Sequence, residues 1–129
     1  MVSRETIVHV CAVLLAVFLL FALEYAGILP ETGPAPVWVA LLFYGLVFGG
    51  AHLYLALRGE GGIVPVEARW RYLAMLVVLL GAGAVIVSAG DRSIVGVELE
   101  SVGIAVVVLT VLVYFVDEAV AGYRSARPE

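Results

Sequence analysis

The chain has 129 residues, of which 64% are hydrophobic and 14% are charged, and its formal net charge is -4. Soluble domains are about 45–50% apolar and about 25% charged, and a soluble fold of this size exposes a large share of its surface to water. The composition therefore excludes a soluble enzyme, a nucleic-acid-binding protein and a disordered linker. It predicts a small integral membrane protein.

The basic residues are all arginine, and the chain contains no lysine, asparagine or glutamine. Together with the many alanine, valine and glycine residues, this bias suggests a GC-rich prokaryotic source such as a haloarchaeon or an actinobacterium. The net negative charge argues against a nucleic-acid partner. The single cysteine, Cys11, cannot form an intramolecular disulfide and belongs to no zinc-binding spacing, so no metal site is expected.

Four apolar stretches are long enough to cross a membrane, which takes about 20 mostly apolar residues for about 30 Å of hydrocarbon. In chain order, the stretches without charged residues are 6–23, 32–57, 72–90 and 101–116. The helices predicted from them span about 7–27, 37–57, 71–89 and 99–121. We therefore predict an all-α fold, an integral membrane bundle of four transmembrane helices that form a single domain over residues 1–129.

The connecting loops are too short to form a soluble domain. The glycine-rich loop at 58–62 lacks the Lys-Ser/Thr of a phosphate-binding loop and joins two membrane helices, so it is interpreted as a flexible hairpin loop. Pro65 and Glu67 are typical of the start of a helix, where proline fits the first turn and an acid favours the helix dipole.

The arginines predict the orientation of the chain. With four spans, the N-terminus, the loop at 58–71 and the C-terminal tail lie on one side of the membrane. Positive charge concentrates on the cytoplasmic side of membrane proteins. We therefore predict a multi-pass protein of the cell membrane with both termini in the cytoplasm. The arginines on that side are Arg4, Arg58, Arg69, Arg71, Arg124 and Arg127, and Arg92 is on the other.

Each predicted helix carries one stripe of small or polar residues. Lipid gives helices no hydrophobic reason to associate, so they meet where small residues let their backbones approach. Gly45 and Gly49 form a G-x-x-x-G pattern, which fits packing within the chain and also a homo-oligomer interface. The residues predicted to pack helices together are Ala12, Ala16, Gly45, Gly49, Gly81, Ala84 and Gly103.

Polar residues of several helices converge on the predicted cytoplasmic leaflet. Both histidines lie on the small-residue stripes, and at 1.5 Å per residue their depths differ by only about 4–5 Å. Ionisable residues inside a membrane are costly and are functional candidates by default. The candidate polar cluster consists of His9, His52, Tyr114, Asp117 and Glu118.

Several interpretations of this cluster stay open. The histidines can hydrogen-bond between helices while the acids lie among the lipid headgroups. His9 and His52 can instead ligate a b-type haem between two helices. As a third interpretation, His52, Tyr114 and Asp117 or Glu118 can carry protons, because histidine titrates near neutral pH.

The sequence gives little support for catalysis. Ser88 is predicted near the outer end of its helix, far from both histidines, and no catalytic residues are assigned. The favoured function is a non-catalytic accessory or assembly subunit that acts through helix–helix contacts. Its predicted partners are the lipid bilayer and other membrane subunits or a second copy of itself. The alternative is a small oligomeric transporter, or a proton-coupled or haem-binding redox subunit, that uses His9, His52, Tyr114 and Asp117.

Overall fold

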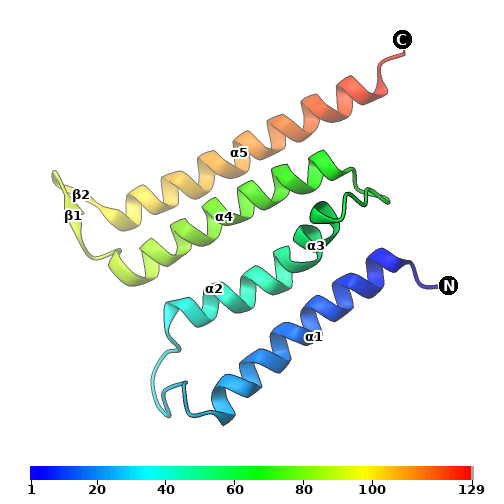
Figure 1. The fold of residues 1–129 in the computed structure, drawn as a ribbon. Coiled ribbons are helices and arrows are strands. Elements are labelled where there is room, and N and C mark those ends of the chain that lie inside the picture. The colour runs from blue at the N-terminus through cyan, green and yellow to red at the C-terminus, as the bar shows by residue number, and fades with distance from the viewer. Residues whose placement is uncertain (129) are drawn as a thin grey trace. The chain divides into compact units, whose positions relative to one another are not determined.

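The computed structural model describes residues 1–128, which are mostly helical (Figure 1). Four helical stretches are long and apolar enough to cross a membrane: Arg4–Tyr25, Val37–Leu57, Val66–Ala89 and Leu99–Ala126. The predicted number of apolar helices is therefore confirmed, and these helices are compatible with a small membrane protein.

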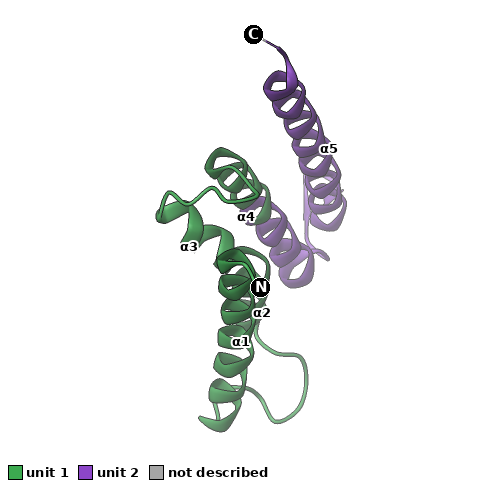
Figure 2. Ribbon diagram, turned by 90° about the vertical axis from the view of Figure 1, so that its right-hand side faces the viewer, with its two compact units in different colours: residues 1–76 green, residues 77–129 purple. Residues whose placement is uncertain are grey.

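The chain folds into two compact units, one formed by Met1–Leu76 and the other by the residues from Val77 onward (Figure 2). Helix α4, Val66–Ala89, begins in the first unit and ends in the second. The single transmembrane domain over residues 1–129 stays a prediction, and its last residue, Glu129, lies outside the described residues.

Helix α1, Arg4–Tyr25, has clear signals at both ends. The Ser3 hydroxyl accepts a hydrogen bond from the backbone N–H of Thr6 at 3.1 Å, so the helix starts three residues before the predicted start. At the other end, Gly27 has a φ of +68° and its N–H donates to the carbonyl of Glu24. This left-handed glycine ends the helix two residues before the predicted end.

The second span is one continuous helical stretch of three parts. It consists of α2, Val37–Gly45, the π-helical segment η1, Leu46–Gly50, and α3, Ala51–Leu57. A π segment has i→i+5 hydrogen bonds, so it shifts the register of the residues that follow. A prediction that steps by three and four residues through an α-helix misses this shift.

The third and fourth spans are longer than predicted. Helix α4 starts at Val66, directly after Pro65, so the proline and acidic start signal is correct and the predicted start at residue 71 is five residues late. Helix α5, Leu99–Ala126, continues five residues beyond the predicted end. The two predicted bounds, at residues 71 and 121, lie near the ends of the charge-free stretches. A helix can continue through charged residues once it extends past the hydrocarbon, so these residues do not mark its end.

A short β-hairpin connects α4 and α5, which the all-α prediction does not include. Strand β1, Ser93–Ile94, pairs antiparallel with β2, Val97–Glu98, and Ile94 lies opposite Val97. The two linking residues, Val95 and Gly96, both have positive φ values, of 53° and 78°. A two-residue turn with this backbone matches the twist of paired strands.

Small residues make the close helix contacts within each unit. In the first unit α1 packs against α2, η1 and α3, and Ala16 is buried there. A Cβ at Gly50 would lie 3.4 Å from Cβ of Ala12, and a Cβ at Gly49 would lie 2.7 Å from Cδ2 of Leu76. The helices at these points are therefore as close as small side chains permit.

In the second unit, a Cβ at Gly103 of α5 would lie 2.5 Å from Cγ1 of Ile86 on α4. Gly45 and Ala84 are half-buried. Gly81 is exposed, and a Cβ at Gly81 would meet no atom of the described residues within 4 Å. The structure therefore gives Gly81 no close packing contact within residues 1–128, and the role of the predicted set in assembly stays a prediction.

Candidate functional site

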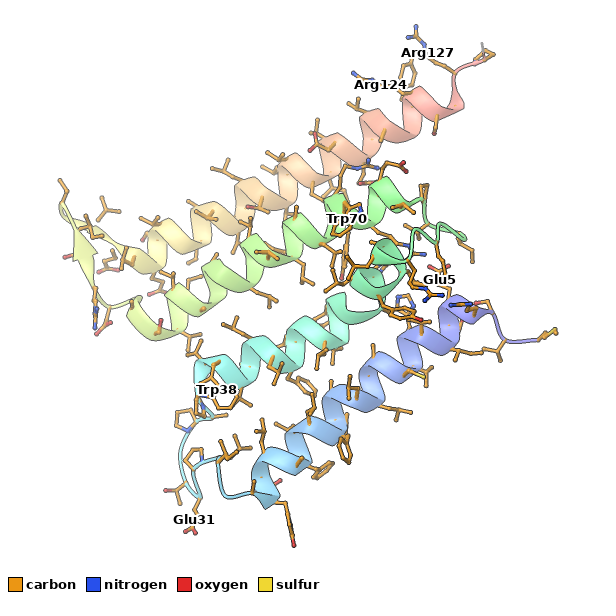
Figure 3. The ribbon with its side chains drawn as sticks, in the orientation of Figure 1. Glu5, Glu31, Trp38, Trp70, Arg124 and Arg127 are labelled. Carbon is orange, nitrogen blue, oxygen red and sulfur yellow. The ribbon has the colours of Figure 1, made fainter. Side chains whose placement is uncertain are left out.

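Arg69 is the only buried charged side chain among residues 1–128, with 1% of its surface exposed. It lies one turn into α4, at the end of the first unit that also holds Glu5 and Trp70 (Figure 3). A charge is tolerated in such a place only when it is paired and hydrogen-bonded. The partners of Arg69 therefore define the candidate site.

The Arg69 guanidinium joins three other segments of the chain. Its Nη2 donates to Oε1 of Glu5 at the start of α1 and to the carbonyl oxygen of Gly61, both at 2.8 Å. Its Nη1 donates to Nδ1 of His52 on α3 at 3.0 Å. One side chain thus connects the first turn of α1, the start of α3 and the loop before α4.

The two histidines are in direct contact. Nε2 of His9 and Nε2 of His52 are 3.5 Å apart, and the ring centroids are 5.0 Å apart at an interplanar angle of 84°. Nδ1 of His9 lies 2.8 Å from the carbonyl oxygen of Glu5. Tyr72 lies on the other side of His52, with 4.6 Å between the ring centroids, and its hydroxyl donates to the carbonyl of Phe48 in η1 at 2.9 Å.

The hydrogen-bond partners assign one tautomer to each histidine. Arginine only donates, so Nδ1 of His52 accepts and its Nε2 carries the proton. The Glu5 carbonyl only accepts, so Nδ1 of His9 carries the proton and its Nε2 accepts from His52. The result is a directed chain from Arg69 through His52 and His9 to the Glu5 carbonyl, in which both imidazoles are neutral.

The glycine-rich loop closes over the carboxylate of Glu5. Gly62 has a φ of +63°, and a Cβ at this position would lie 3.0 Å from Oε2 of Glu5. The backbone N–H of Ile63 donates to the same oxygen at 3.4 Å. The sequence predicts a flexible connection here, whereas the carbonyl of Gly61 and the N–H of Ile63 both bind the ion pair.

A second, exposed group of charges lies at the same end of the first unit. Glu60 accepts from Arg4 at 3.0 Å and lies 3.6 Å from Nε of Arg58, and both arginine side chains are more than half exposed. Exposed ion pairs of this kind contribute little to stability, about 0–1 kcal/mol.

Within the first unit, the structure shows one contact of the predicted polar cluster. His9 and His52 meet in the first unit, while Tyr114, Asp117 and Glu118 belong to α5 in the second. Asp117 is exposed, and Tyr114 and Glu118 are half-buried.

Sequence reasoning missed Glu5 and Arg69 because both flank the apolar stretches, where charged residues normally meet water. Glu5 precedes His9 by four residues and therefore shares its helix face, so the spacing could have indicated that Glu5 lies beside His9.

The haem-binding interpretation of His9 and His52 stays a prediction. In this structure the two Nε2 atoms meet directly, and Nδ1 of His52 accepts from Arg69. Within residues 1–128, no three His, Cys, Asp or Glu side chains come together in a way that could hold a metal ion.

No protein-family model, curated protein or solved structure shows detectable similarity to this chain.

Replacing Arg69 by alanine should lower the free energy of unfolding in detergent micelles by about 3 kcal/mol. Removal of one partner of a buried ion pair costs about 3–5 kcal/mol, and the lower end applies because Glu5 keeps 18% of its side chain exposed. Arg58→Ala is the matched control, since its ion pair is exposed, and its effect should stay below about 1 kcal/mol. Equal effects of the two variants would contradict a structural role for Arg69.

Proposed function

We propose that this protein is a non-catalytic accessory or assembly subunit of a membrane complex, acting through helix–helix contacts. The observation that carries the proposal is the use of the Arg69 side chain within the chain itself. Its two terminal nitrogens bind Glu5, Gly61 and His52, and of its polar atoms only Nε lacks a partner in the described residues. Such a network fixes helices in place.

This arrangement leaves the polar site with little to offer a substrate. A binding or catalytic site needs polar groups that are free to meet a ligand. Here one Glu5 oxygen binds Arg69 and the other accepts from Ile63, while the two histidines bind each other. The network therefore supports a structural role, in which it holds the helices together at one end of the first unit. The exposed faces of these helices, which can contact a partner, are apolar.

The outward face of α1 offers such a surface. Leu14, Phe18, Phe21 and Tyr25 follow one another at helical spacing and are 62%, 68%, 64% and 96% exposed. Side chains at i, i+4, i+7 and i+11 share one face of a helix. Bulky side chains on one face can enter the grooves of a neighbouring membrane helix, so we propose that this face contacts a larger membrane subunit.

The charges support an orientation with the N-terminus in the cytoplasm. Arg4 and Arg58 share Glu60, so the basic residues of the first unit lie at one end. Glu31 lies with Trp38 at the other end (Figure 3). We propose that the basic end faces the cytoplasm of a cell membrane, as positive charge does in membrane proteins in general.

Purification from native membranes in a mild detergent should yield a larger membrane protein in stoichiometric amount. The double variant Phe18→Ala/Phe21→Ala should lose this partner, because it removes both rings from the α1 face while leaving the Arg69 network intact. Phe115→Ala is the control, since Phe115 is equally exposed but lies on α5. Quantitative mass spectrometry gives the ratio of partner to chain. A parent chain that purifies alone would contradict the proposal.

The contact between His9 and His52 favours a second candidate, a proton-coupled membrane subunit. Two imidazoles that lie in two candidate spans and are joined by a hydrogen bond can pass a proton between them. This candidate rests on the two histidines of the first unit alone.

The two candidates give opposite results in proteoliposomes with an imposed pH gradient and an enclosed pH-sensitive dye. A proton-coupled protein dissipates the gradient, and His52→Ala should slow this at least about tenfold because it breaks the chain of hydrogen bonds, as does the loss of a positioned proton-transfer group in general. Ser88→Ala, outside the network, should match the parent. A parent protein that leaks no faster than empty liposomes would exclude this candidate and leave the first in place.

A further inference from the structure

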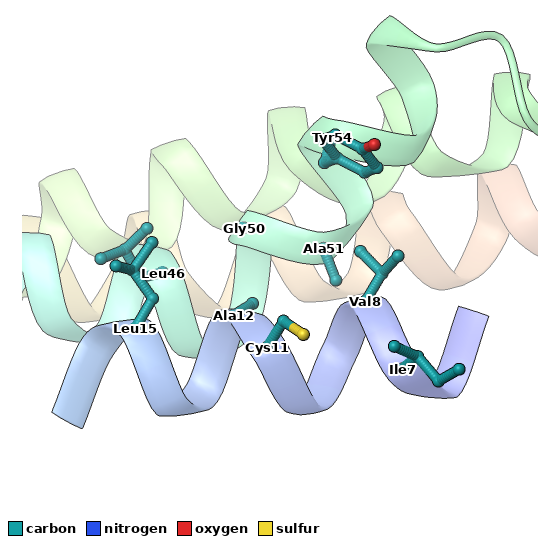
Figure 4. Close-up of a pocket in the computed structure, with 9 residues that line it drawn as sticks. All are labelled: Ile7, Val8, Cys11, Ala12, Leu15, Leu46, Gly50, Ala51 and Tyr54. Carbon is teal, nitrogen blue, oxygen red and sulfur yellow. The ribbon is translucent and has the colours of Figure 1, made fainter. Parts of the chain in front are cut away.

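An apolar groove runs between α1 and the stretch formed by η1 and α3, within the first unit (Figure 4). Its volume is about 340 Å³, at the lower end of the range of about 300–1,000 Å³ that small-molecule sites occupy. All of its lining residues belong to the two candidate spans Arg4–Tyr25 and Val37–Leu57. The groove therefore lies at the depth of the lipid chains if these helices cross a membrane.

Small residues form the groove. Ala12 on α1 packs closely against Gly50, and both residues line the groove together with Ala51, so no large side chain fills the groove at this point. Larger apolar side chains, Leu15 and Leu46, lie together at one end of it (Figure 4). An opening of this shape admits a flexible hydrocarbon chain. Such a chain makes van der Waals contacts with the groove that the small side chains do not make with each other.

One end of the groove leads to positive charge. Tyr54 lines the groove, and the guanidinium carbon of Arg58 lies over its ring, 5.9 Å from the centroid. Arg58 and Arg4 share the single carboxylate of Glu60. The two arginines and Glu60 together carry a net charge of +1. The side chain of Arg58 is 57% exposed and that of Arg4 is 61% exposed. The carboxylate of Glu5 does not reduce this charge, because it binds Arg69.

We propose that this groove binds an anionic phospholipid. One acyl chain lies along the groove that α1 forms with η1 and α3, over Ala12, Gly50 and Ala51, and the headgroup phosphate lies beside Arg58. An apolar channel that ends at an uncompensated cation matches the two parts of such a lipid, and each arginine near a membrane surface favours anionic lipid. The inference is independent of the proposed subunit function.

A second copy of the chain fits this groove less well. Copies inserted in the same direction are related by an axis along the membrane normal, so a symmetric dimer would bring identical ends together. The arginine pairs of the two copies, Arg4 and Arg58, would then face each other at the same depth and repel. The charge thus favours lipid over a second copy.

The test uses nitroxide-labelled phosphatidylglycerol and phosphatidylcholine in phosphatidylcholine vesicles that contain the full-length protein. Electron paramagnetic resonance separates lipid held by the protein from bulk lipid. Labelled phosphatidylglycerol should associate about fivefold more strongly than labelled phosphatidylcholine, equivalent to about 1 kcal/mol for one arginine. Arg58→Gln should remove this preference, while Arg92→Gln, at the exposed residue directly before β1 in the second unit, should keep it.

A second pair of variants tests the acyl-chain site. Cys11→Phe places a ring in the groove and should reduce the held fraction of labelled phosphatidylglycerol. Val13→Phe adds a ring on α1 at an exposed position outside the groove and should leave that fraction unchanged. Equal association of the two lipids, or an unchanged fraction in Cys11→Phe, would overturn the proposal. Rapid oxidative cross-linking of the parent through Cys11 would overturn it too, because a second copy would then occupy the groove.

Discussion

The burial of one positive charge organises the first unit of this protein. The Arg69 guanidinium can stay charged out of water only if its donors are satisfied, and its partners come from α1, α3 and the loop before α4. The apolar helices alone do not specify their register, because lipid covers one apolar face as well as another. The ion pair with Glu5 and the hydrogen bond to His52 supply that specificity.

The same interaction accounts for the local features around it. The loop needs glycine at residue 62, because a side chain there would press on the Glu5 carboxylate. The hydrogen bonds through the two histidines run in one direction. Arg69 can only donate at one end of this chain of bonds, and the Glu5 carbonyl can only accept at the other. The polar groups at this end of the first unit therefore bind one another. A proposed partner or lipid can contact the apolar surfaces of α1 and α3 and the exposed arginines Arg4 and Arg58.

The helices could be predicted from the sequence, because apolar runs as long as a bilayer is thick are typical of membrane-spanning helices. Their ends were less predictable. Ser3 starts α1 through its side-chain cap, Gly27 ends it through a left-handed backbone, and the π segment η1 shifts the register without a signal in hydropathy. Of the candidate site, the sequence identified His9 and His52, since they lie on small-residue stripes. Charges alone could not distinguish Arg69, which is buried, from Arg58, which is exposed.

The protonation of the two histidines tests most directly whether Arg69 organises this site. Nitrogen-15 spectra of histidine-labelled protein in lipid, assigned with His9→Gln and His52→Gln variants, distinguish the two tautomers of each ring. The geometry predicts that neutral His9 carries its proton on Nδ1 and that neutral His52 carries its proton on Nε2. A proton on Nδ1 of His52 would contradict it, because that nitrogen could not then accept a hydrogen bond from Arg69.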